Sequence, residues 1–484
     1  MSCEPKRRVG VLFRQSSVVI RISSFGLFVC MGAFAKEIEL VERICSPALI
    51  GRVSDVAGLT VTATGLPAAT GTLCRIHTKH GAPLEAQVVG FRDDRTLLMP
   101  LSDALGVSRG DEVVAEPGEA RVGVCEALLG RMLDGMGRPL DGGRTLHYDD
   151  WYPLYRTAPR ALERERITRP IGTGIRAIDA LTTVGRGQRM GLFAGTGVGK
   201  SVLMGMIARN TDADVVVCAL IGERGREVND FLEKNLGPEG RRKSVMVIST
   251  SDESPVLRVR AGFVATAVAE YFRDRGRHVL LLMDSVTRLA MAQRQIGLAA
   301  GEPPATKGYT PSVFGMLPQL LERAGQTERG SVTGIYTVLV EADDMNDPIG
   351  DAVRGILDGH LWLSRSLASK AHYPAISVTD SISRVMPDVV DEQHLSAART
   401  IVRNLAVWNE IEDLVNIGAY AAGSNPQFDT VIQTRPAVLA FLQQAVGDRV
   451  SLAESRKQLL VLAQQIEETA ARLSKTDKTV KKKP

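Results

Sequence analysis

The 484-residue sequence predicts an α/β core that is preceded by a small β-barrel or sandwich and followed by a helical domain. Short apolar runs broken by turn residues come first, longer apolar runs alternating with helical patterns follow, and helical periodicity alone closes the chain. The length allows about three domains. We expect an extension at 1–45, a β-barrel domain at 46–118, the core at 119–390 and a helical domain with a basic tail at 391–484.

Charge and composition exclude several classes of protein. Hydrophobic residues make up 44% and charged residues 24% of the chain, which excludes collagen-like, wholly disordered and multi-span membrane proteins. The net charge of +4 is concentrated at the two ends, and the body between residues 37 and 474 has 48 basic and 53 acidic residues. A body with net charge −5 has no overall field for a long nucleic acid, so we expect no nucleic-acid partner. The spacing of the cysteines and histidines predicts neither a disulfide framework nor a zinc or histidine metal site.

The first 36 residues imitate a secretory signal, because a basic start is followed by 14 uncharged residues from Ile22 to Ala35. That run is shorter than the about 20 residues of a membrane-spanning helix. We interpret the segment as an N-terminal extension, consistent with a start codon chosen too early, and Met31 is the internal alternative.

The barrel or sandwich is predicted from short, regularly spaced strands with turn signals between them. A glycine-rich stretch, Gly130–Gly143, then reads as a connector. The expected strands are 59–64, 73–77, 86–91, 96–101 and 111–115.

The core is predicted from continuous apolar runs, which are typical of parallel strands covered by helices on both faces. A helix is expected between them, with Ser254 as N-cap, Pro255 at its first position and Gly276 beyond its end. The last domain is helical because Leu452, Leu459 and Ile466 recur on one helix face. The expected core strands are 215–221, 245–249, 278–283 and 335–340.

A glycine-rich turn at 195–199 separates an apolar strand from Lys200 and Ser201, which open a helix. This is the pattern G-x-x-x-x-G-K-[ST] of a P-loop, with Ala194 in place of the first glycine. The glycines let backbone N–H groups point at a polyphosphate, the lysine contacts phosphate, and the serine hydroxyl suits Mg²⁺. The alternative is a merely tight strand-to-helix turn. The expected nucleotide-binding residues are Ala194, Gly195, Thr196, Gly197, Val198, Gly199, Lys200, Ser201 and Val202.

Two further strands end in carboxylates. Asp284 closes 278–284, where P-loop enzymes place the residue that orders Mg²⁺ and its waters. Glu223 and Arg224 follow 215–221 on the same predicted edge of the sheet, and a carboxylate there suits the activation of water. An alternative interpretation is that these residues form a ladder of salt bridges on the surface of the following helix. That set would comprise Glu223, Arg224, Arg226 and Glu227.

Several motifs together resemble the flagellar type III protein-export ATPases, which are related to the catalytic subunit of rotary ATP synthases. The resemblance spans about residues 49–441. It implies a RecA-like P-loop ATPase core, with ATP and Mg²⁺ as ligands. The motifs are GLFAGTGVGKS, IGERGREV, HVLLLMDSVTRLAMAQRQIGLAAGEPPATKGYTPSVF, DGHLWLSR, HYPAI and SISR.

The resemblance also implies roles for single residues. Lys200 and Ser201 would bind phosphate and Mg²⁺, Glu223 would be the general base, Arg224 a γ-phosphate contact and Asp284 the second Mg²⁺ carboxylate. Tyr373 would stack on adenine, although a core tyrosine before a proline bend is the alternative.

Arg384 matches the family's arginine finger, which enters the site of a neighbouring subunit. This implies a homohexameric ring, with the barrels as a crown and the helical domains facing the export gate. Residues Glu302 to Phe314 resemble the loop that meets a coiled-coil stalk, with an ordinary surface loop as the alternative. Phe34 to Cys45 could supply about three turns of the helix that binds a regulatory stator. The lysine tail has no assigned role.

The family resemblance implies a cytoplasmic protein at the cytoplasmic face of the export apparatus, with peripheral membrane association and chaperone–cargo complexes as partners. A virulence-type secretion ATPase shares every catalytic residue, although GAYAAGSNP at 418–426 favours the flagellar branch. Two further hypotheses are a non-catalytic ring subunit, which would carry glutamine in place of Glu223, and a hexameric nucleic-acid translocase.

Overall fold

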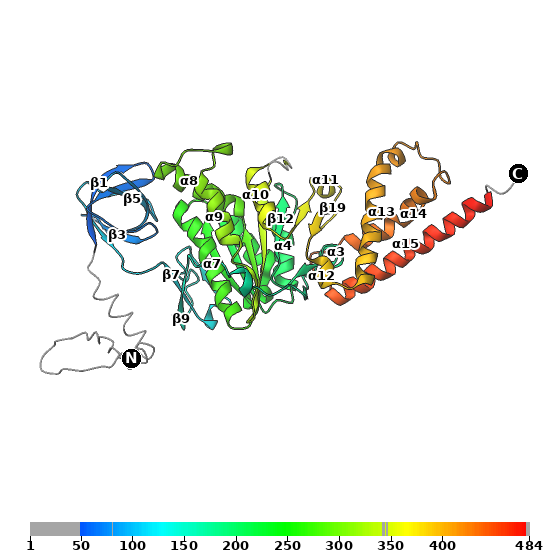
Figure 1. Ribbon diagram of the computed structural model, residues 1–484, viewed down its shortest axis with the longest axis horizontal. Coiled ribbons are helices and arrows are strands. Elements are labelled where there is room, and N and C mark those ends of the chain that lie inside the picture. Colours follow the sequence, from blue (N-terminus) through cyan, green and yellow to red (C-terminus); the bar gives the residue numbers. More distant parts are fainter. Residues whose placement is uncertain (1–48, 80, 341–343, 345–346, 481–484) are drawn as a thin grey trace, which may run out of the picture.

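The computed structural model describes residues 49–480 apart from 80, 341–343 and 345–346, with side chains described as far as residue 475. The predicted extension at 1–45, its segment Phe34–Cys45 and the end of the lysine tail lie outside the described residues. The described chain is elongated, with a barrel at one end, a sheet flanked by helices in the middle and a helical domain at the other end (Figure 1).

The N-terminal unit is a closed barrel with strand order β1-β2-β5-β4-β3-β6, which selects the barrel over the sandwich. Val61, Ile76 and Leu98 fill its interior. The first strand escaped prediction because polar residues and a glycine interrupt its apolar pattern, and only Gly51 and Val53 in it are buried. The strands are β1 (Ile50–Ala57), β2 (Thr60–Thr64), β3 (Leu73–His77), β4 (Leu84–Arg92), β5 (Arg95–Pro100) and β6 (Glu112–Ala115).

The glycine-rich stretch Gly130–Gly143 was predicted to be a connector. This was wrong for its first residues, which form a strand. Met132 and Leu133 form β8, which pairs in parallel with β14 (Ser244–Thr250) at the edge of the central sheet, and Leu133 is fully buried. The Asp134 carboxylate accepts hydrogen bonds from two backbone N–H groups of the turn that follows. Beside it, β7 (Arg121–Val124) pairs with β9 (Asp150–Pro153).

The predicted α/β core is confirmed. Within the described residues a nine-stranded sheet has the order β19-β18-β12-β17-β15-β13-β14-β8, with β16 beside β17. All neighbours along this order are parallel except β18 and β19. The carboxyl ends of β12, β13, β15 and β17 therefore meet at one edge. The strands are β12 (Arg189–Ala194), β13 (Val215–Glu223), β14 (Ser244–Thr250), β15 (His278–Asp284), β16 (Gly325–Gln326), β17 (Ser331–Leu339), β18 (Gly359–Leu363) and β19 (Ile376–Ser383).

Helices cover both faces of this sheet, as the continuous apolar strands require. In β13, Val217 and Ala219 face one core with α7 (Pro255–Asp274) and α8 (Val286–Ala300). Cys218 and Leu220 face the other core with α4 (Lys200–Asn210) and the helical domain. The small pair β10 (Pro170–Ile171) and β11 (Val184–Gly185) lies outside the sheet. The helices are α3 (Arg176–Leu181), α4 (Lys200–Asn210), α5 (Gly225–Asp230), α6 (Gly237–Arg242), α7 (Pro255–Asp274), α8 (Val286–Ala300), α9 (Pro311–Leu321), α10 (Pro348–Ile356), α11 (Arg365–Ser369) and α12 (Met386–Val389).

Helix α7 has the predicted bounds, but its N-cap residue acts differently. The Ser254 hydroxyl makes no capping hydrogen bond and donates instead to the Pro100 carbonyl at 2.7 Å. This contact ties the sheet to the end of strand β5 in the barrel.

The predicted helical domain is confirmed as α13 (Glu392–Asn416), α14 (Pro426–Leu442) and α15 (Leu452–Val480). Ile401, Phe441 and Leu459 join the apolar core of the sheet, so this domain is packed directly on the α/β unit. No helix in the part of the chain that the structure describes is both long and apolar enough to cross a membrane.

Candidate active site

The P-loop lies between β12 and α4, as the sequence predicts. Gly197 and Gly199 have φ angles of +80° and +89°, a region that residues with a side chain rarely adopt. A Cβ atom on Gly197 would meet nothing within 4 Å, so backbone conformation rather than crowding requires glycine there. Ala194 is still part of β12, pairs with both neighbouring strands and is 2% exposed. Alanine is tolerated at this position because it is a buried strand residue.

Two carboxylates converge on the P-loop lysine from neighbouring strands. Asp284, at the end of β15, forms an ion pair with the Lys200 ammonium, and Glu223 Oε1, at the end of β13, lies 3.6 Å from Lys200 Nζ. The Thr337 hydroxyl on β17 donates to Asp284 Oδ1 at 2.7 Å. The parallel strands thus bring together groups that lie more than 130 residues apart in the chain.

Glu223 is held in an unusual state. Burial, the neighbouring Asp284 charge and a hydrogen bond with Glu227 raise the pKa of Glu223 to about 7, although Lys200 and Arg288 oppose the shift. The same hydrogen bond lowers the pKa of Glu227. The Glu223 side chain is 9% exposed, and its Oε1 has no hydrogen-bond partner. A carboxylate with a near-neutral pKa and a free oxygen is suited to accept a proton from water.

The surface-ladder alternative is wrong for Glu223, which turns inward to Lys200 and Arg288. It describes Arg224 better. That side chain is 79% exposed and lies 3.7 Å from the Glu227 carboxylate one turn along α5. The structure therefore places Arg224 at the rim of the site.

Ser201 and Val202 are exposed in the first turn of α4. Tyr373 is 45% exposed, which contradicts the alternative of a core tyrosine. Its ring lies against the P-loop, because a Cβ atom on Gly199 would be 3.6 Å from the ring carbons Cδ1 and Cε1. The Tyr373 carbonyl accepts a hydrogen bond from the Gln444 N–H at 3.0 Å. An exposed aromatic ring therefore lies beside the P-loop.

Arg384 is the one predicted site residue that the structure places elsewhere. It follows β19, which runs antiparallel to β18, and Ser383 pairs with Gly359. Its N–H donates to the Asp358 carbonyl, and the Asp358 N–H donates to the Arg189 carbonyl at the start of β12. Arg384 is exposed. Since these hydrogen bonds link it to the first residue of β12 and the P-loop follows the last, Arg384 lies at the opposite edge of the sheet from the P-loop.

Two residues of this site escaped the sequence reasoning. Arg288 lies 2.7 Å from Glu223 Oε2, and Thr337 donates to Asp284. A signal existed for Arg288, since it stands four residues after Asp284 in the first turn of the next helix. Thr337 lies within an apolar run and has no distinguishing mark in the sequence.

The donor set fits Mg²⁺ bound together with a nucleotide. No group of three or more His, Cys, Asp or Glu side chains that could hold a metal alone occurs among the described residues. Two buried carboxylates face a single lysine, one carboxylate oxygen lacks a hydrogen-bond partner, and a serine hydroxyl is exposed nearby. Because Lys200 and Arg288 already balance the two carboxylates, a divalent cation would be held together with the negative charge of a nucleotide, and phosphate oxygens and water would be its remaining ligands.

Comparisons with known proteins agree with this geometry. Residues 53–116 match the β-barrel domain of the ATP synthase alpha/beta family, 174–383 match the nucleotide-binding domain of the same family, and 390–460 match the T3SS EscN ATPase C-terminal domain. The flagellum-specific ATP synthase of Pseudomonas aeruginosa is 50% identical over 429 residues, 88% of this chain and 95% of that protein. The type 3 secretion system ATPase of Xanthomonas euvesicatoria is 50% identical over 411 residues, 85% and 93% of the two chains.

A solved structure of the assembled ATPase EscN from the enteropathogenic E. coli type III secretion system is also similar. It has a TM-score of 0.80 and 43% identity, and the match covers 85% of this chain and all of that one. The same ATPase in complex with its central stalk EscO has a TM-score of 0.79. With a P-loop, two converging carboxylates and this degree of identity, the chain belongs to the family of flagellar and type III secretion export ATPases, related to the ATP synthase alpha/beta subunits.

Proposed function

We propose that this ATPase hydrolyses Mg²⁺–ATP in a site shared by two adjacent copies of the chain, and that it energises export through the flagellar apparatus. The observation that carries the shared site is the distance between Arg384 and the P-loop within one chain. The Arg384 N–H donates to the Asp358 carbonyl, and the Asp358 N–H donates to the carbonyl of Arg189 at the start of β12. The P-loop follows the other end of that strand. Five residue steps at about 3.3 Å put roughly 16 Å between these points. An arginine side chain is too short for that gap, which supports a role for Arg384 in a neighbouring site.

The phosphate cradle is built from the backbone of 194–199, with Lys200 as the cation that contacts the β- and γ-phosphates. Val202 lies in the same first helical turn, and the exposed Tyr373 ring would stack on adenine. Ser201 and Asp284 would hold Mg²⁺, which, when bound, neutralises charge on the phosphate oxygens.

Glu223 is the proposed general base. It would take a proton from the attacking water as the water oxygen bonds to the γ-phosphorus and the bond to the β–γ bridging oxygen breaks. Its free Oε1 and its raised pKa of about 7 support this role, because the group can accept a proton near neutral pH. We propose that Arg224, at the rim of the site, contacts the γ-phosphate.

If each site combines the P-loop of one chain with Arg384 of the next, a closed ring completes every site. We propose that this ring is a homohexamer. An isolated chain would lack the finger, so its hydrolysis should be slow. The EscN structures are of an assembled ATPase, with and without its central stalk. For this chain we propose a corresponding coiled-coil stalk at the loop between α8 and α9, within Glu302–Phe314.

We further propose a cytoplasmic location at the export apparatus, with a stator, the export gate and chaperone–cargo complexes as partners. Curated relatives of about 50% identity occur in both the flagellar and the virulence-type branch. The loop 418–426 between α13 and α14 favours the flagellar one. Deletion of the gene should abolish flagella, and loss of needle assembly with intact flagella would assign the protein to the other branch.

The shared site is tested by mixing variants. Arg384→Ala and Lys200→Ala should each hydrolyse ATP at least about 10³-fold more slowly than the wild type. The first variant lacks the arginine finger, and the second lacks the ammonium group that contacts the phosphates. In a one-to-one mixture, half of the sites keep Lys200 and half of these receive an intact finger, so about a quarter of the wild-type rate should return. A mixture that stays inactive while forming rings would refute the proposal.

A further inference from the structure

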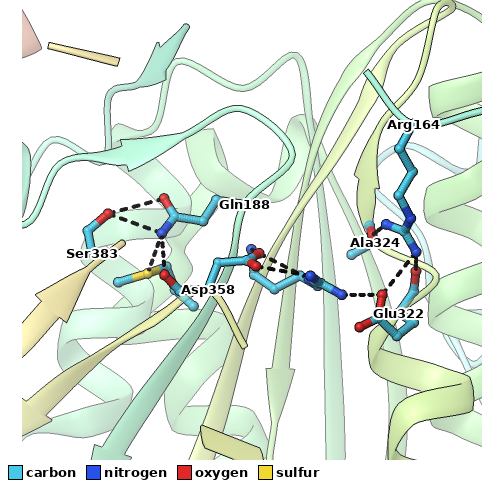
Figure 2. Close-up of polar contacts among 8 residues, drawn as sticks. Arg164, Gln188, Glu322, Ala324, Asp358 and Ser383 are labelled. Atoms are coloured by element: carbon cyan, nitrogen blue, oxygen red, sulfur yellow. Dashed lines mark hydrogen bonds and ion pairs between the residues drawn. The ribbon is translucent and has the colours of Figure 1, made fainter. Parts of the chain in front are cut away.

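Figure 2 shows a network of polar side chains that includes Gln188, Asp358 and Glu322. The network surrounds Arg189, the first residue of β12, and so lies at the opposite end of this strand from the P-loop. Its centre is the pair formed by Arg189 and Asp358. The Asp358 carboxylate accepts three hydrogen bonds from Arg189, from the backbone N–H, Nε and Nη2, each at 3.0 Å. The two side chains are only 14% and 26% exposed. Two-pronged charged pairs of this kind fix geometry as well as adding stability.

The backbone of Asp358 joins this pair to Arg384. The Asp358 carbonyl accepts from the Arg384 N–H at 3.0 Å and from Gln188 Nε2 at 3.2 Å. The preceding residue is held as well, because Gln188 Nε2 donates to the Ser383 hydroxyl and this hydroxyl donates to the Thr183 carbonyl. The peptide that carries Arg384 is therefore tied to the first residues of β12.

The network continues to the far side of the sheet edge. Glu322, the C-cap residue of α9, forms an ion pair with Arg189 and accepts a hydrogen bond from Arg164 at 3.0 Å. Arg164 also donates to the Ala324 carbonyl at 3.0 Å. The Arg189 guanidinium is thus held between the carboxylates of Glu322 and Asp358, and Arg189 in turn fixes Asp358.

We propose that Asp358 is a positioning residue for Arg384, held in place by Arg189. This inference rests on the proposed function, in which Arg384 acts in the site of a neighbouring chain. The Arg384 side chain is exposed, so its own chain can set the position of the guanidinium chiefly through the backbone to which it is attached. Asp358 and Gln188 fix that backbone by hydrogen bonds and leave the side chain free to reach outward.

The effect should be large enough to measure. A displacement of about 1 Å of a catalytic group costs on the order of 10²-fold in rate, whereas removal of an arginine finger costs about 10³- to 10⁵-fold. Asp358→Asn keeps the size of the side chain and the backbone carbonyl but loses the charged two-pronged pair. We expect it to lower kcat about tenfold and to leave KM for ATP unchanged. Arg189→Lys, which keeps the charge and loses the fork, should act in the same direction.

The decisive measurement is complementation with Lys200→Ala, whose finger is intact. A variant that displaces only its own Arg384 keeps an intact P-loop site, which Arg384 of a Lys200→Ala chain can complete. A one-to-one mixture of the two should therefore reach about a quarter of the wild-type rate. A variant that distorts its own P-loop through β12 would gain nothing from the same partner. Rescue of Asp358→Asn and of Arg189→Lys therefore supports positioning of the finger and excludes a general structural role.

Asp141→Asn is the matched control. Arg131 binds Asp141 through Nε and Nη2 at 2.7–3.0 Å, and both side chains are 13% exposed, beside β8 and away from Arg384. Its kcat should stay within about twofold of the wild type. An equal slowing in this control, no slowing in Asp358→Asn, or no rescue of Asp358→Asn would overturn the inference. If the mixture of Arg384→Ala with Lys200→Ala also fails to recover activity, the proposal of a shared site is refuted. If that mixture recovers activity and the mixture of Asp358→Asn with Lys200→Ala does not, only the positioning role of Asp358 is refuted.

Discussion

The two edges of the central sheet are built in opposite ways. At the carboxyl edge, Glu223 has an oxygen without a hydrogen-bond partner and shares a crowded site with a second carboxylate. At the amino edge, the Asp358 carboxylate accepts three hydrogen bonds and its carbonyl two. A buried carboxylate oxygen that lacks a hydrogen bond can still accept one from a ligand, whereas a carboxylate that already accepts three hydrogen bonds holds its neighbours in place. The same sheet thus provides a reactive edge and a rigid one.

The largest effect should come from the reactive edge. Glu223→Gln keeps the shape of the side chain and removes the proton acceptor, so turnover should fall about 10²- to 10⁴-fold while ATP binding is retained. Turnover by the wild type should rise with pH through about 7, because Glu223, with a raised pKa of about 7, must lose its proton to act as a base. Steady-state rates and calorimetric binding at several pH values check both points. Wild-type turnover in the variant would remove Glu223 from the mechanism.

Tyr373 should give an intermediate effect that is confined to binding. Stacking of a base on an aromatic ring contributes about 1–3 kcal/mol, so Tyr373→Ala should raise the dissociation constant for ATP roughly tenfold. Tyr373→Phe keeps the ring and serves as the control. Equilibrium titration with a fluorescent ATP analogue distinguishes the variants. Equal weakening by both substitutions would point to the hydroxyl rather than to stacking.

The smallest effect concerns the thermal stability of the protein without nucleotide. Here we expect Glu223→Gln, which lowers turnover, to stabilise the fold. Since the folded-state pKa of Glu223 lies above its ordinary value of 4.5, this group favours folding at low pH, and that contribution is lost as the pH rises toward about 7. Glu223→Gln imitates the protonated form. It should therefore melt a few degrees higher than the wild type at pH 8, with a difference that shrinks toward pH 5. A lower melting temperature of the variant at pH 8 would contradict the comparison of the two edges.

Sequence reasoning reached the reactive edge because its residues follow a simple rule. Lys200, Glu223 and Asp284 each stand at or shortly after the end of a buried strand, and parallel strands bring such positions together. The strands of the core were recognisable for the same reason, since burial on both faces leaves continuous apolar runs.

The features that escaped prediction depend on contacts between distant segments. Strand β8 has two residues and forms only because β14 offers it an edge. The Ser254 hydroxyl, a capping group by its position, is drawn to the Pro100 carbonyl of another domain. The separation of Arg384 from the P-loop depends on β19 reversing direction, and no local pattern in the sequence encodes that reversal.

Strand β12 has a P-loop at its far end and Arg189 at its first residue. Nucleotide binding at one end of this short strand would therefore act, through Arg189 and Asp358, on the backbone that carries Arg384, the residue that we propose to act in the site of the next chain. In a ring of such chains, nucleotide binding in one site would then affect ATP hydrolysis in the neighbouring site. The order in which the sites hydrolyse ATP would depend on this six-residue strand.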